Sequence, residues 1–189
     1  MVKPKEIAIF LDRDGVINSY PGDTKYVTSW KEFCFLPRAR EAVALLTSKK
    51  YPVFVISNQA GVSKGVYSQD TLNDITKRML KGLEKSGARI DSVYYCTHRD
   101  EDNCFCRKPK DGLIKSAIKG RRINLKNSFF IGDTIRDVHT AKAAGCKSIL
   151  VLSGKEKLFN RKNWEMQPHF IFKDLYEASE FILNHHNFV

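Results

Sequence analysis

The sequence predicts an α/β protein: a doubly wound parallel sheet with helices on both faces, as in Rossmann-like folds. Two observations indicate this class. Short apolar runs alternate along the chain with amphipathic segments of helical period, the order that builds right-handed βαβ units. The apolar runs are also continuous rather than alternating, as in strands buried on both faces. The 189 residues contain no Pro-, Gly- or Ser-rich linker and no internal repeat, so residues 1–189 are expected to form one domain.

The first half of the chain supplies three strands and two helices. Strands are predicted at residues 7–11, 51–56 and 93–95. Between the first two, Pro37 suits a first helical turn and Lys49–Lys50 suits a helix C-terminus. Between the second and third, Ser68 can cap a helix that Gly87 closes. The apolar face of that helix repeats at helical spacing through Leu72, Ile75, Met79 and Leu83.

The second half continues the alternation. A helix at 113–118, a strand at 129–131, a helix at 135–144 before Gly145, and a strand at 148–152 are predicted. A C-terminal strand–helix unit follows at 169–185, in which Asp174 and Glu177 have capping-box spacing. The polar, basic stretch 154–168 is expected to be a surface loop. No large insertion follows the predicted strand at 7–11, so we expect no second domain that covers the end of the sheet.

Composition and charge exclude some classes of protein. Hydrophobic residues make up 42% and charged residues 28%, as is typical of globular proteins. No apolar run approaches the roughly 20 residues that span a bilayer, and residues 1–5 lack a signal-peptide pattern. We therefore expect a cytoplasmic, monomeric enzyme without a membrane partner. The net charge of +11 indicates attraction to anions, but the dispersed Lys and Arg do not choose among nucleic acid, lipid and phosphorylated metabolites.

Polar residues directly follow the predicted strands. In a doubly wound sheet, ligands bind at the carboxyl ends of the strands, so these residues are expected to meet at one edge. They are Asp12, Asp14 and Gly15 after the first strand, Ser57 and Asn58 after the second, Cys96 and His98 after the third, and Asp133, Thr134 and Asp137 after the fourth. The set combines carboxylates, a hydroxyl and metal-binding groups, which favours an active site.

The acidic residues predict a magnesium site. Asp12 and Asp14 lie two residues apart in an extended segment, so their side chains start on the same side. Two such carboxylates repel each other unless a cation lies between them. Asp133 adds a third oxygen ligand, and hard oxygen donors suit Mg²⁺. One carboxylate can then attack phosphorus. The alternative is that Asp12 and Asp14 are only turn formers before Gly15.

The cysteines predict a zinc site in a small loop at 96–106. Cys96-x-His98 and Cys104-x-Cys106 supply three thiolates and one imidazole, the set that closes a tetrahedral structural zinc site. The alternative is a reduced cysteine cluster with His98 facing solvent. The remaining thiols, Cys34 and Cys146, are expected to be buried and to have no ligand role.

Four motifs carry a family resemblance over residues 6–152. The segment Phe10–Asn18 resembles the first motif of the haloacid dehalogenase (HAD) superfamily of phosphatases, and Ser57–Gln59 resembles the second. Lys108 matches the third motif and Gly132–Asp137 the fourth. Together with the cysteines, the chain is similar to the zinc-bearing branch that acts on heptose bisphosphates and on histidinol phosphate.

The resemblance implies a role for each matched residue. Asp12 would be the nucleophile that forms an aspartyl-phosphate, and Asp14 the general acid and base. Ser57 and Lys108 would hold the phosphoryl oxygens. The remaining implied roles are substrate binding for Asn58 and Arg107, magnesium binding for Asp12, the Asp14 carbonyl and Asp133, and support of that shell for Asp137. The zinc would be structural and would organise Arg107 and Lys108, which follow Cys106 directly. The family's usual lysine after the fourth-motif aspartate is Thr134 here.

Features of the chain divide between substrates. Residues 59–67, 26–27 and 33–37 resemble the heptose branch, whereas the short loop 99–103 and the segment 107–110 resemble histidinol-phosphatases. A small sugar phosphate, with heptose 1,7-bisphosphate first, is favoured over histidinol phosphate. Related phosphatases act on nucleic acid 3′-ends, but no aromatic-interleaved basic strip favours a polymer here. A zinc-ribbon binding module would leave Asp12, Asp14 and Asp133 unexplained.

Overall fold

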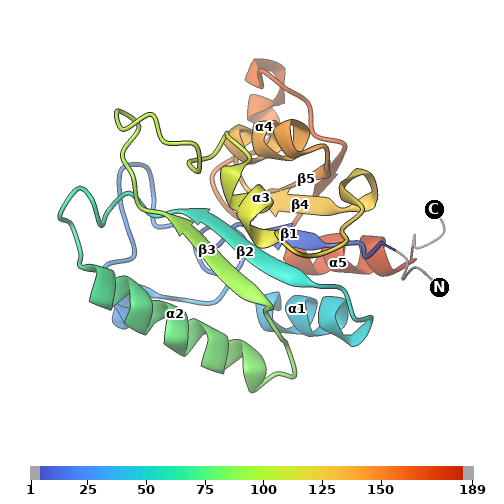
Figure 1. Cartoon of the computed structure of the whole chain (residues 1–189), viewed down its shortest axis with the longest axis horizontal. Helices are drawn as coiled ribbons and strands as arrows, with labels where there is room; N and C mark the ends of the chain where they lie inside the picture. The colour runs from blue at the N-terminus through green and yellow to red at the C-terminus, as the bar shows by residue number, and fades with distance from the viewer. Residues whose placement is uncertain (1–4, 185–189) are drawn as a thin grey trace.

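A computed structural model describes residues 5–184 of the chain. Its described part contains one six-stranded sheet in which all neighbouring strands are parallel, in the order β3-β2-β1-β4-β5-β6 (Figure 1). The strands are β1 (Ile9–Leu11), β2 (Val53–Asn58), β3 (Ser92–Cys96), β4 (Phe129–Gly132), β5 (Lys147–Val151) and β6 (Phe170–Phe172). The predicted doubly wound α/β class is confirmed.

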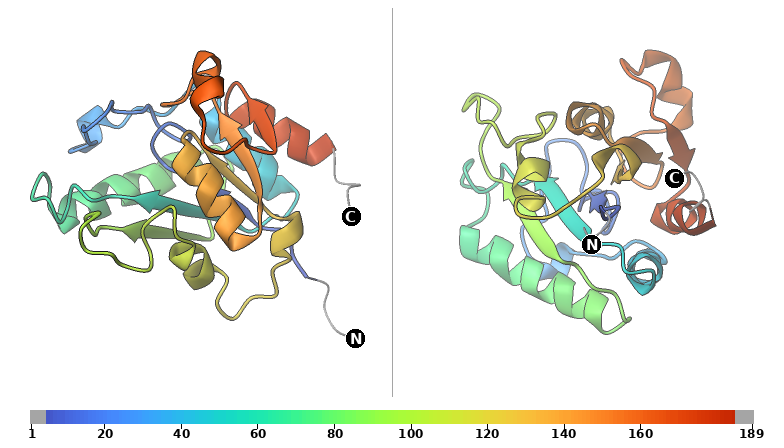
Figure 2. Two further views of the ribbon diagram at one scale, coloured as in Figure 1. Left: turned by 90° about the horizontal axis from the view of Figure 1, so that it is seen from above. Right: turned by 45° about the vertical axis from the view of Figure 1, so that its right-hand side comes forward.

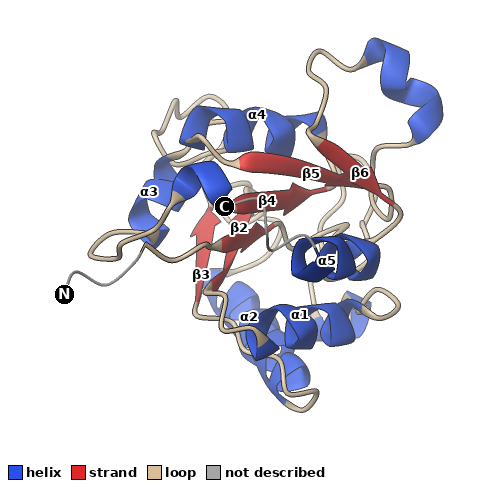
Figure 3. Ribbon diagram, turned by 90° about the vertical axis from the view of Figure 1, so that its right-hand side faces the viewer, coloured by secondary structure: helices blue, strands red, loops and turns tan. Residues whose placement is uncertain are grey.

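Helices cover both faces of the sheet. They are α1 (Ala39–Ser48), α2 (Gln69–Glu84), α3 (Gly112–Ala117), α4 (Ile135–Ala144) and α5 (Leu175–Asn184). Figure 3 shows α1, α2 and α5 on one face of the sheet and α3 and α4 on the other. Short 3₁₀ helices lie at Trp30–Glu32, Leu125–Asn127 and Leu158–Asn163. Every predicted helix is present, within a few residues of its predicted bounds.

The pleat of the strands separates two main cores. On β1, Ile9 and Leu11 point into the core beneath α1, α2 and α5, while Phe10 points into the core beneath α3 and α4. Phe54 and Phe130, from the two strands beside β1, lie in the same core as Phe10. Because both faces are covered, the central strands are apolar throughout, which is why they were recognisable as continuous runs.

Helix ends follow the capping residues in the sequence. Ser68 accepts a hydrogen bond from the N–H of Thr71 at the start of α2, as its spacing predicts. At α5, Asp174 accepts from the N–H of Glu177, but the carboxylate of Glu177 accepts from Lys173 rather than from Asp174. The predicted capping box at α5 is therefore only half formed. Residue 185, the last of the predicted C-terminal unit, and residues 1–4 lie outside the described residues.

Two local predictions were wrong. The stretch 154–168 is more than a surface loop: it contains the 3₁₀ helix Leu158–Asn163, and Trp164 is buried. Cys34 is exposed rather than buried, because it lies between the buried ring of Phe33 and the half-buried ring of Phe35 in an alternating segment. Cys146 is buried as predicted.

The strand order brings the segments after the strands to one end of the sheet. The order reverses between β1 and β4, which are neighbours although far apart in sequence, and this switch point is where α/β folds bind ligands. In Figures 1 and 2 the segments after β1, β2 and β3 project from the same end. Among the described residues, none of the helices has the length and apolar character needed to cross a membrane.

Candidate active site

The switch point holds Asp12 and Asp133 side by side. Asp12 follows β1, and its N–H donates to the carbonyl of Ile131 on β4 at 2.9 Å. Asp133 follows β4 and is almost fully buried. Gly15 makes this approach possible: its φ is +80°, and a Cβ there would lie 2.2 Å from an oxygen of Asp133. The backbone after β1 therefore packs directly against the second carboxylate.

Three carboxylates and one lysine form the centre of the site. Oxygens of Asp12, Asp133 and Asp137 lie within 4.8 Å of one another, and all three residues are buried. The ammonium of Lys108 lies 2.7 Å from Asp12 Oδ2 and 2.6 Å from Asp137 Oδ1. One positive charge thus faces three groups that are negative when ionised. The cluster favours one further cation.

The pKa values reflect this imbalance. Burial, opposed by Lys108, raises the pKa of Asp12 to about 6. Burial and the neighbouring carboxylates of Asp137 and Asp12 raise the pKa of Asp133 well above its usual range. Burial disfavours the charged form of Lys108, but Asp12 and Asp137 outweigh it and raise the pKa of its ammonium. Lys108 is therefore a permanent cation.

Asp14 lies outside this cluster and has its own partner. Arg13, whose side chain is fully buried, donates to both oxygens of Asp14. Asn18 and Gln59 donate to the same carboxylate at 2.8 and 2.9 Å. The carboxylate of Asp14 is thus paired with a guanidinium, and a cation shared by the Asp12 and Asp14 side chains stays a prediction. The backbone of Asp14 remains beside Asp12.

The segment after β2 contributes a hydroxyl and an amide. The hydroxyl of Ser57 is buried and hydrogen-bonds to Asp12. Asn58 Oδ1 accepts from the N–H of Lys108 at 3.1 Å, and its Nδ2 donates to the Lys108 carbonyl at 3.2 Å. This amide is occupied by the backbone of Lys108. Asn58 therefore fixes the position of the lysine, whatever contact it makes with a ligand.

One cavity of about 840 Å³ joins most of the predicted residues. Asp12, Asp14, Ser57, Asn58, Lys108, Asp133 and Thr134 all line it. Arg107 does not: its guanidinium forms two hydrogen bonds with Asp100 and a third with the carbonyl of His98. The structure thus brings together the residues that the resemblance predicts to handle phosphate and leaves Arg107 in an ion pair beside them.

Thr134 and Asp137 form the N-terminal cap of α4. Thr134 Oγ1 and the Thr134 N–H donate to Asp137 Oδ2 at 2.6 and 3.1 Å, while the N–H of Asp137 donates back to Thr134 Oγ1. This capping box leaves Asp137 Oδ1 free to accept from Lys108. Thr134 therefore holds Asp137 in place and carries no charge itself.

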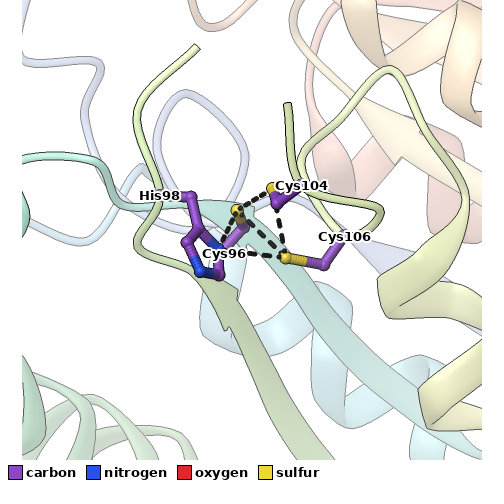
Figure 4. A group of neighbouring side chains, drawn as sticks. All are labelled: Cys96, His98, Cys104 and Cys106. Carbon is purple, nitrogen blue, oxygen red and sulfur yellow. Dashed lines mark hydrogen bonds between the residues drawn. The ribbon is translucent and has the colours of Figure 1, made fainter. Parts of the chain in front are cut away.

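The predicted zinc ligands converge on one point (Figure 4). The three sulfur–sulfur distances among Cys96, Cys104 and Cys106 are 3.3, 3.5 and 3.6 Å. His98 Nδ1 lies 3.6 Å from Cys96 Sγ and 3.4 Å from Cys106 Sγ. A tetrahedral zinc with sulfur ligands at about 2.3 Å separates them by roughly 3.8 Å, so the spacing and the donor set fit zinc.

The carboxylate cluster fits a magnesium ion on similar grounds. Its donors are hard oxygens, and octahedral ligands about 2.1 Å from Mg²⁺ lie roughly 3 to 4 Å apart, within the observed separation. The surplus of negative charge in a buried setting gives the cluster a reason to bind a cation. Asp133 Oδ2 already accepts from the N–H of Lys155 at 2.8 Å, which leaves its other oxygen for an ion.

Several residues around the cavity were missed by sequence reasoning. The rule that polar residues after strands form the site had been applied to four strands only. After β5, Ser153 donates to the Gly15 carbonyl and Lys155 contacts Asp133 and Asp23. Applied to the fifth strand, the same rule would have found them. Arg136 also lines the cavity; it lies within the fourth-motif segment Gly132–Asp137, but the resemblance implies no role for its side chain.

Comparisons with known proteins agree with this geometry. A family model described as HAD-hydrolase-like matches residues 105–178. The D-glycero-beta-D-manno-heptose-1,7-bisphosphate 7-phosphatase of Neisseria meningitidis is 34% identical over 177 residues, which are 93% of this chain and 94% of that protein. The same-named protein of Rhodopseudomonas palustris is 39% identical over 149 residues, covering 75% and 81%.

Solved structures give the same answer. The D,D-heptose 1,7-bisphosphate phosphatase of Bordetella bronchiseptica, solved with magnesium and phosphate, superposes with a TM-score of 0.88 at 31% identity and covers 94% of this chain and 98% of its own. The Burkholderia thailandensis enzyme gives 0.68 at 25% identity, covering 94% and 99%. Fold and site therefore define a HAD-like phosphatase. Within that class, the chain belongs to the D-glycero-beta-D-manno-heptose-1,7-bisphosphate 7-phosphatase family.

Proposed function

We propose that this phosphatase removes the 7-phosphate of D-glycero-D-manno-heptose 1,7-bisphosphate. The names of its relatives support this substrate, and the relatives match over most of their length. The cavity, about 840 Å³ in volume, is of a size that holds a small metabolite. We further propose that the enzyme is a cytoplasmic monomer that acts without a nucleic acid or membrane partner.

In the proposed reaction, an oxygen of Asp12 attacks the phosphorus of the 7-phosphate. The bond between phosphorus and the sugar oxygen breaks, and Asp14 gives a proton to the departing alkoxide. Water then attacks the aspartyl-phosphate while Asp14 accepts its proton. The bond between phosphorus and Asp12 breaks, phosphate is released, and both carboxyl groups return to their starting state.

The contact between Lys108 and Asp12 is the single observation that carries the assignment of Asp12 as the nucleophile of a phosphatase. A nucleophilic carboxylate that lies 2.7 Å from a buried ammonium has a cation ready beside the phosphoryl group that it attacks. The Ser57 hydroxyl, which hydrogen-bonds to Asp12, can turn to a phosphoryl oxygen of the substrate. Lys108 and Ser57 would thus hold the transferred group from two sides.

We propose Asp12, Asp133 and the backbone carbonyl of Asp14 as the magnesium ligands, with Asp137 supporting them through Lys108. A bound Mg²⁺ would neutralise phosphoryl oxygens as negative charge builds on them. The residues themselves do the positioning: Thr134 holds Asp137, Asp137 holds Lys108, and the N–H of Lys155 holds Asp133. The charge balance of the cluster supports a divalent cation over none.

We propose a structural role for zinc in the loop 96–106. Its four donors leave no open coordination position for a substrate. Cys106 is followed directly by Arg107 and Lys108, so an ordered Cys106 sets where the lysine enters the cavity. In the structure Lys108 indeed points into the site from this segment, while Arg107 points to Asp100.

A phosphate-release assay tests the substrate. The purified protein with Mg²⁺ is given heptose 1,7-bisphosphate, histidinol phosphate and a 3′-phosphorylated oligonucleotide at equal concentration. The proposal expects the highest kcat/KM with the heptose bisphosphate. A higher value with histidinol phosphate, which the short loop 99–103 favoured, or with the oligonucleotide would overturn it.

A further inference from the structure

The carboxylate of Asp14 is held more elaborately than a surface acid would be. Arg13 donates to Oδ1 through Nε and Nη2 and to Oδ2 through Nη2, at 3.0 to 3.1 Å. Asn18 Nδ2 adds a bond to Oδ1 at 2.8 Å, and Gln59 Nε2 adds one to Oδ2 at 2.9 Å. Arg13, Asn18 and Gln59 are all almost fully buried. The orientation of this carboxylate is therefore set by the protein.

The two oxygens of Asp14 differ in how tightly they are held. Oδ1 accepts three hydrogen bonds, from two guanidinium nitrogens and one amide. Oδ2 accepts one from Arg13 Nη2, which it shares with Oδ1, and one from Gln59. Since a buried guanidinium needs a nearby negative charge, Oδ1 stays anchored on Arg13. Oδ2 is the less tightly held oxygen and so the one available for proton transfer, and Gln59 sets its direction.

The amide of Gln59 has a defined direction. Tyr67 donates its hydroxyl to Gln59 Oε1 at 2.6 Å, so the amide nitrogen must face the other way. That nitrogen donates to Asp14 Oδ2 and, at 3.3 Å, to Ser57 Oγ. One amide group thereby joins the proton-transfer residue to the hydroxyl proposed to hold the phosphoryl group.

The loop after β2 is built to place Tyr67. Gly61 packs so closely on the Tyr67 ring that a Cβ would lie 2.2 Å from a ring carbon. Tyr26, which lines the cavity, also packs against Tyr67, and the centroids of the two rings are 6.1 Å apart. The N–H of Gln59 donates to the carbonyl of Cys96, a zinc-loop residue, at 2.7 Å. Packing against Gly61 and Tyr26 therefore fixes Tyr67, and the backbone bond to Cys96 fixes Gln59.

We propose that Gln59, oriented by Tyr67, is a positioning residue that directs Asp14 Oδ2 toward the proton it transfers. Gln59 Nε2 carries two hydrogens, so it can donate to Asp14 Oδ2 and to Ser57 Oγ at the same time. The Ser57 oxygen keeps accepting from Gln59 when its own proton turns to a phosphoryl oxygen. One amide therefore holds the acid in a fixed position relative to the hydroxyl that binds the phosphoryl group. This inference rests on the proposed acid role of Asp14.

Leaving-group dependence tests the inference, because proton donation matters only where the leaving oxygen is strongly basic. A sugar phosphate expels an alkoxide, which needs the proton. p-Nitrophenyl phosphate expels a weakly basic phenolate, which does not. The value of kcat/KM reports on the steps up to aspartyl-phosphate formation, so its ratio between the two substrates measures the acid alone. A general loss of folding or of phosphate binding would lower both values together.

Two variants and one control define the outcomes for the positioning role. Gln59→Met keeps the length of the side chain and removes its hydrogen bonds, and we expect kcat/KM for the heptose bisphosphate to fall about 30-fold while that for p-nitrophenyl phosphate changes less than about threefold. Tyr67→Phe removes one oxygen and should give a smaller loss with the same selectivity. Tyr94→Phe, on the opposite pleat of β3, should change neither value. Tyr67→Phe keeps the test valid even if Gln59→Met fails to fold.

Asp14→Asn separates the inference from the proposed function. It should lower kcat/KM for the sugar phosphate by about 10²-fold or more and leave p-nitrophenyl phosphate nearly unaffected. If Asp14→Asn shows this selectivity but the Gln59 and Tyr67 variants lower both substrates equally, the positioning role is wrong and the acid role stands. If Asp14→Asn itself shows no selectivity, the acid role fails and the inference fails with it.

Discussion

The two clusters of potential metal ligands in this protein differ in how their donor atoms are arranged. The cysteine and histidine donors of residues 96–106 lie near the corners of a tetrahedron, whose sulfur–sulfur edges are 3.3 to 3.6 Å long. The carboxylates of Asp12, Asp133 and Asp137 gather instead around the ammonium of Lys108. One cluster is closed around a point, and the other opens onto a cavity.

The number of protein donors decides whether each cluster can bind a substrate beside its metal. Four protein donors leave a structural zinc no room for a ligand, whereas three carboxylates leave most of an octahedral shell to water and substrate. In the carboxylate cluster, burial raises the pKa of Asp12 to about 6 although Lys108 opposes this, so keeping that carboxylate ionised destabilises the fold. In the carboxylate cluster, the ionised state that catalysis needs is therefore the less stable one. In the cysteine cluster, bound zinc would favour both the fold and the position of Lys108.

The largest expected effect comes from the nucleophile in the open cluster. Asp12→Asn should lower kcat by about 10⁴-fold or more, because an amide neither attacks phosphorus nor binds Mg²⁺ as an anion. The measurement is phosphate release from the heptose bisphosphate under saturating Mg²⁺. Asp74→Asn, an exposed carboxylate on α2, is the matched control and should behave as wild type. Activity of Asp12→Asn near that of the control would remove the proposed nucleophile.

The closed cluster should affect catalysis only through position. Cys104→Ala is expected to release zinc and to lower kcat/KM by about 10²-fold, since a displacement of Lys108 by about 1 Å has effects of that size. Zinc content is measured by atomic spectroscopy beside turnover. Cys34→Ala removes an exposed thiol outside the loop and should change neither. A zinc-free Cys104→Ala protein with full activity would show that the two clusters are independent.

Stability should reveal the electrostatic cost of the open cluster. The pKa of Asp12 is raised from 3.8 to about 6, so its folded state holds the proton more tightly than the unfolded chain. That contribution to stability is complete below about pH 4 and is lost as pH rises through about 6. Without Mg²⁺, Asp12→Asn should therefore be more stable than wild type at pH 7.5, by an amount on the order of 2 kcal/mol.

Denaturant unfolding of both proteins at pH 5 and pH 7.5 measures this effect. The difference between them should shrink at pH 5, because wild-type Asp12 is then largely protonated. Taking the difference cancels any shared change at the zinc loop. Added Mg²⁺ should stabilise wild type more than Asp12→Asn. If Asp12→Asn is less stable than wild type at pH 7.5 in Mg²⁺-free buffer, the predicted cost of ionising the buried Asp12 is wrong.

Much of the molecule was predictable because its signals are local. The strands are continuous apolar runs, and Ser68, Thr134 and Gly145 mark helix ends through their own backbone preferences. The site residues follow the strands, and the rule for parallel sheets therefore predicts that they meet at one edge. The four candidate zinc ligands are marked by their residue types and spacing together with the family resemblance.

What could not be predicted is which partner each polar side chain takes. Arg13 stands between two aspartates in sequence, but only tertiary packing shows that it turns inward and pairs with Asp14. The burial of Trp164 depends on contacts with Val138 and Leu150, which are distant in the chain. Cys34 has apolar neighbours yet is exposed, because alternation in an extended segment outweighs local hydrophobicity. These outcomes depend on distances that no pattern in the sequence encodes.

The smallest expected effect concerns Arg107, which lies between the two clusters in sequence and belongs to neither. We propose that it recognises the second phosphate of the substrate by exchanging Asp100, an exposed partner, for that phosphate. Arg107→Lys keeps the charge and loses the two-pronged contact, so KM for the bisphosphate should rise about tenfold with kcat nearly unchanged. KM for a heptose monophosphate should change little, and Arg99→Lys in the same loop should change neither. An equal rise for both substrates would mean that Arg107 only supports the zinc loop, and the link between the clusters would then run through Lys108 alone.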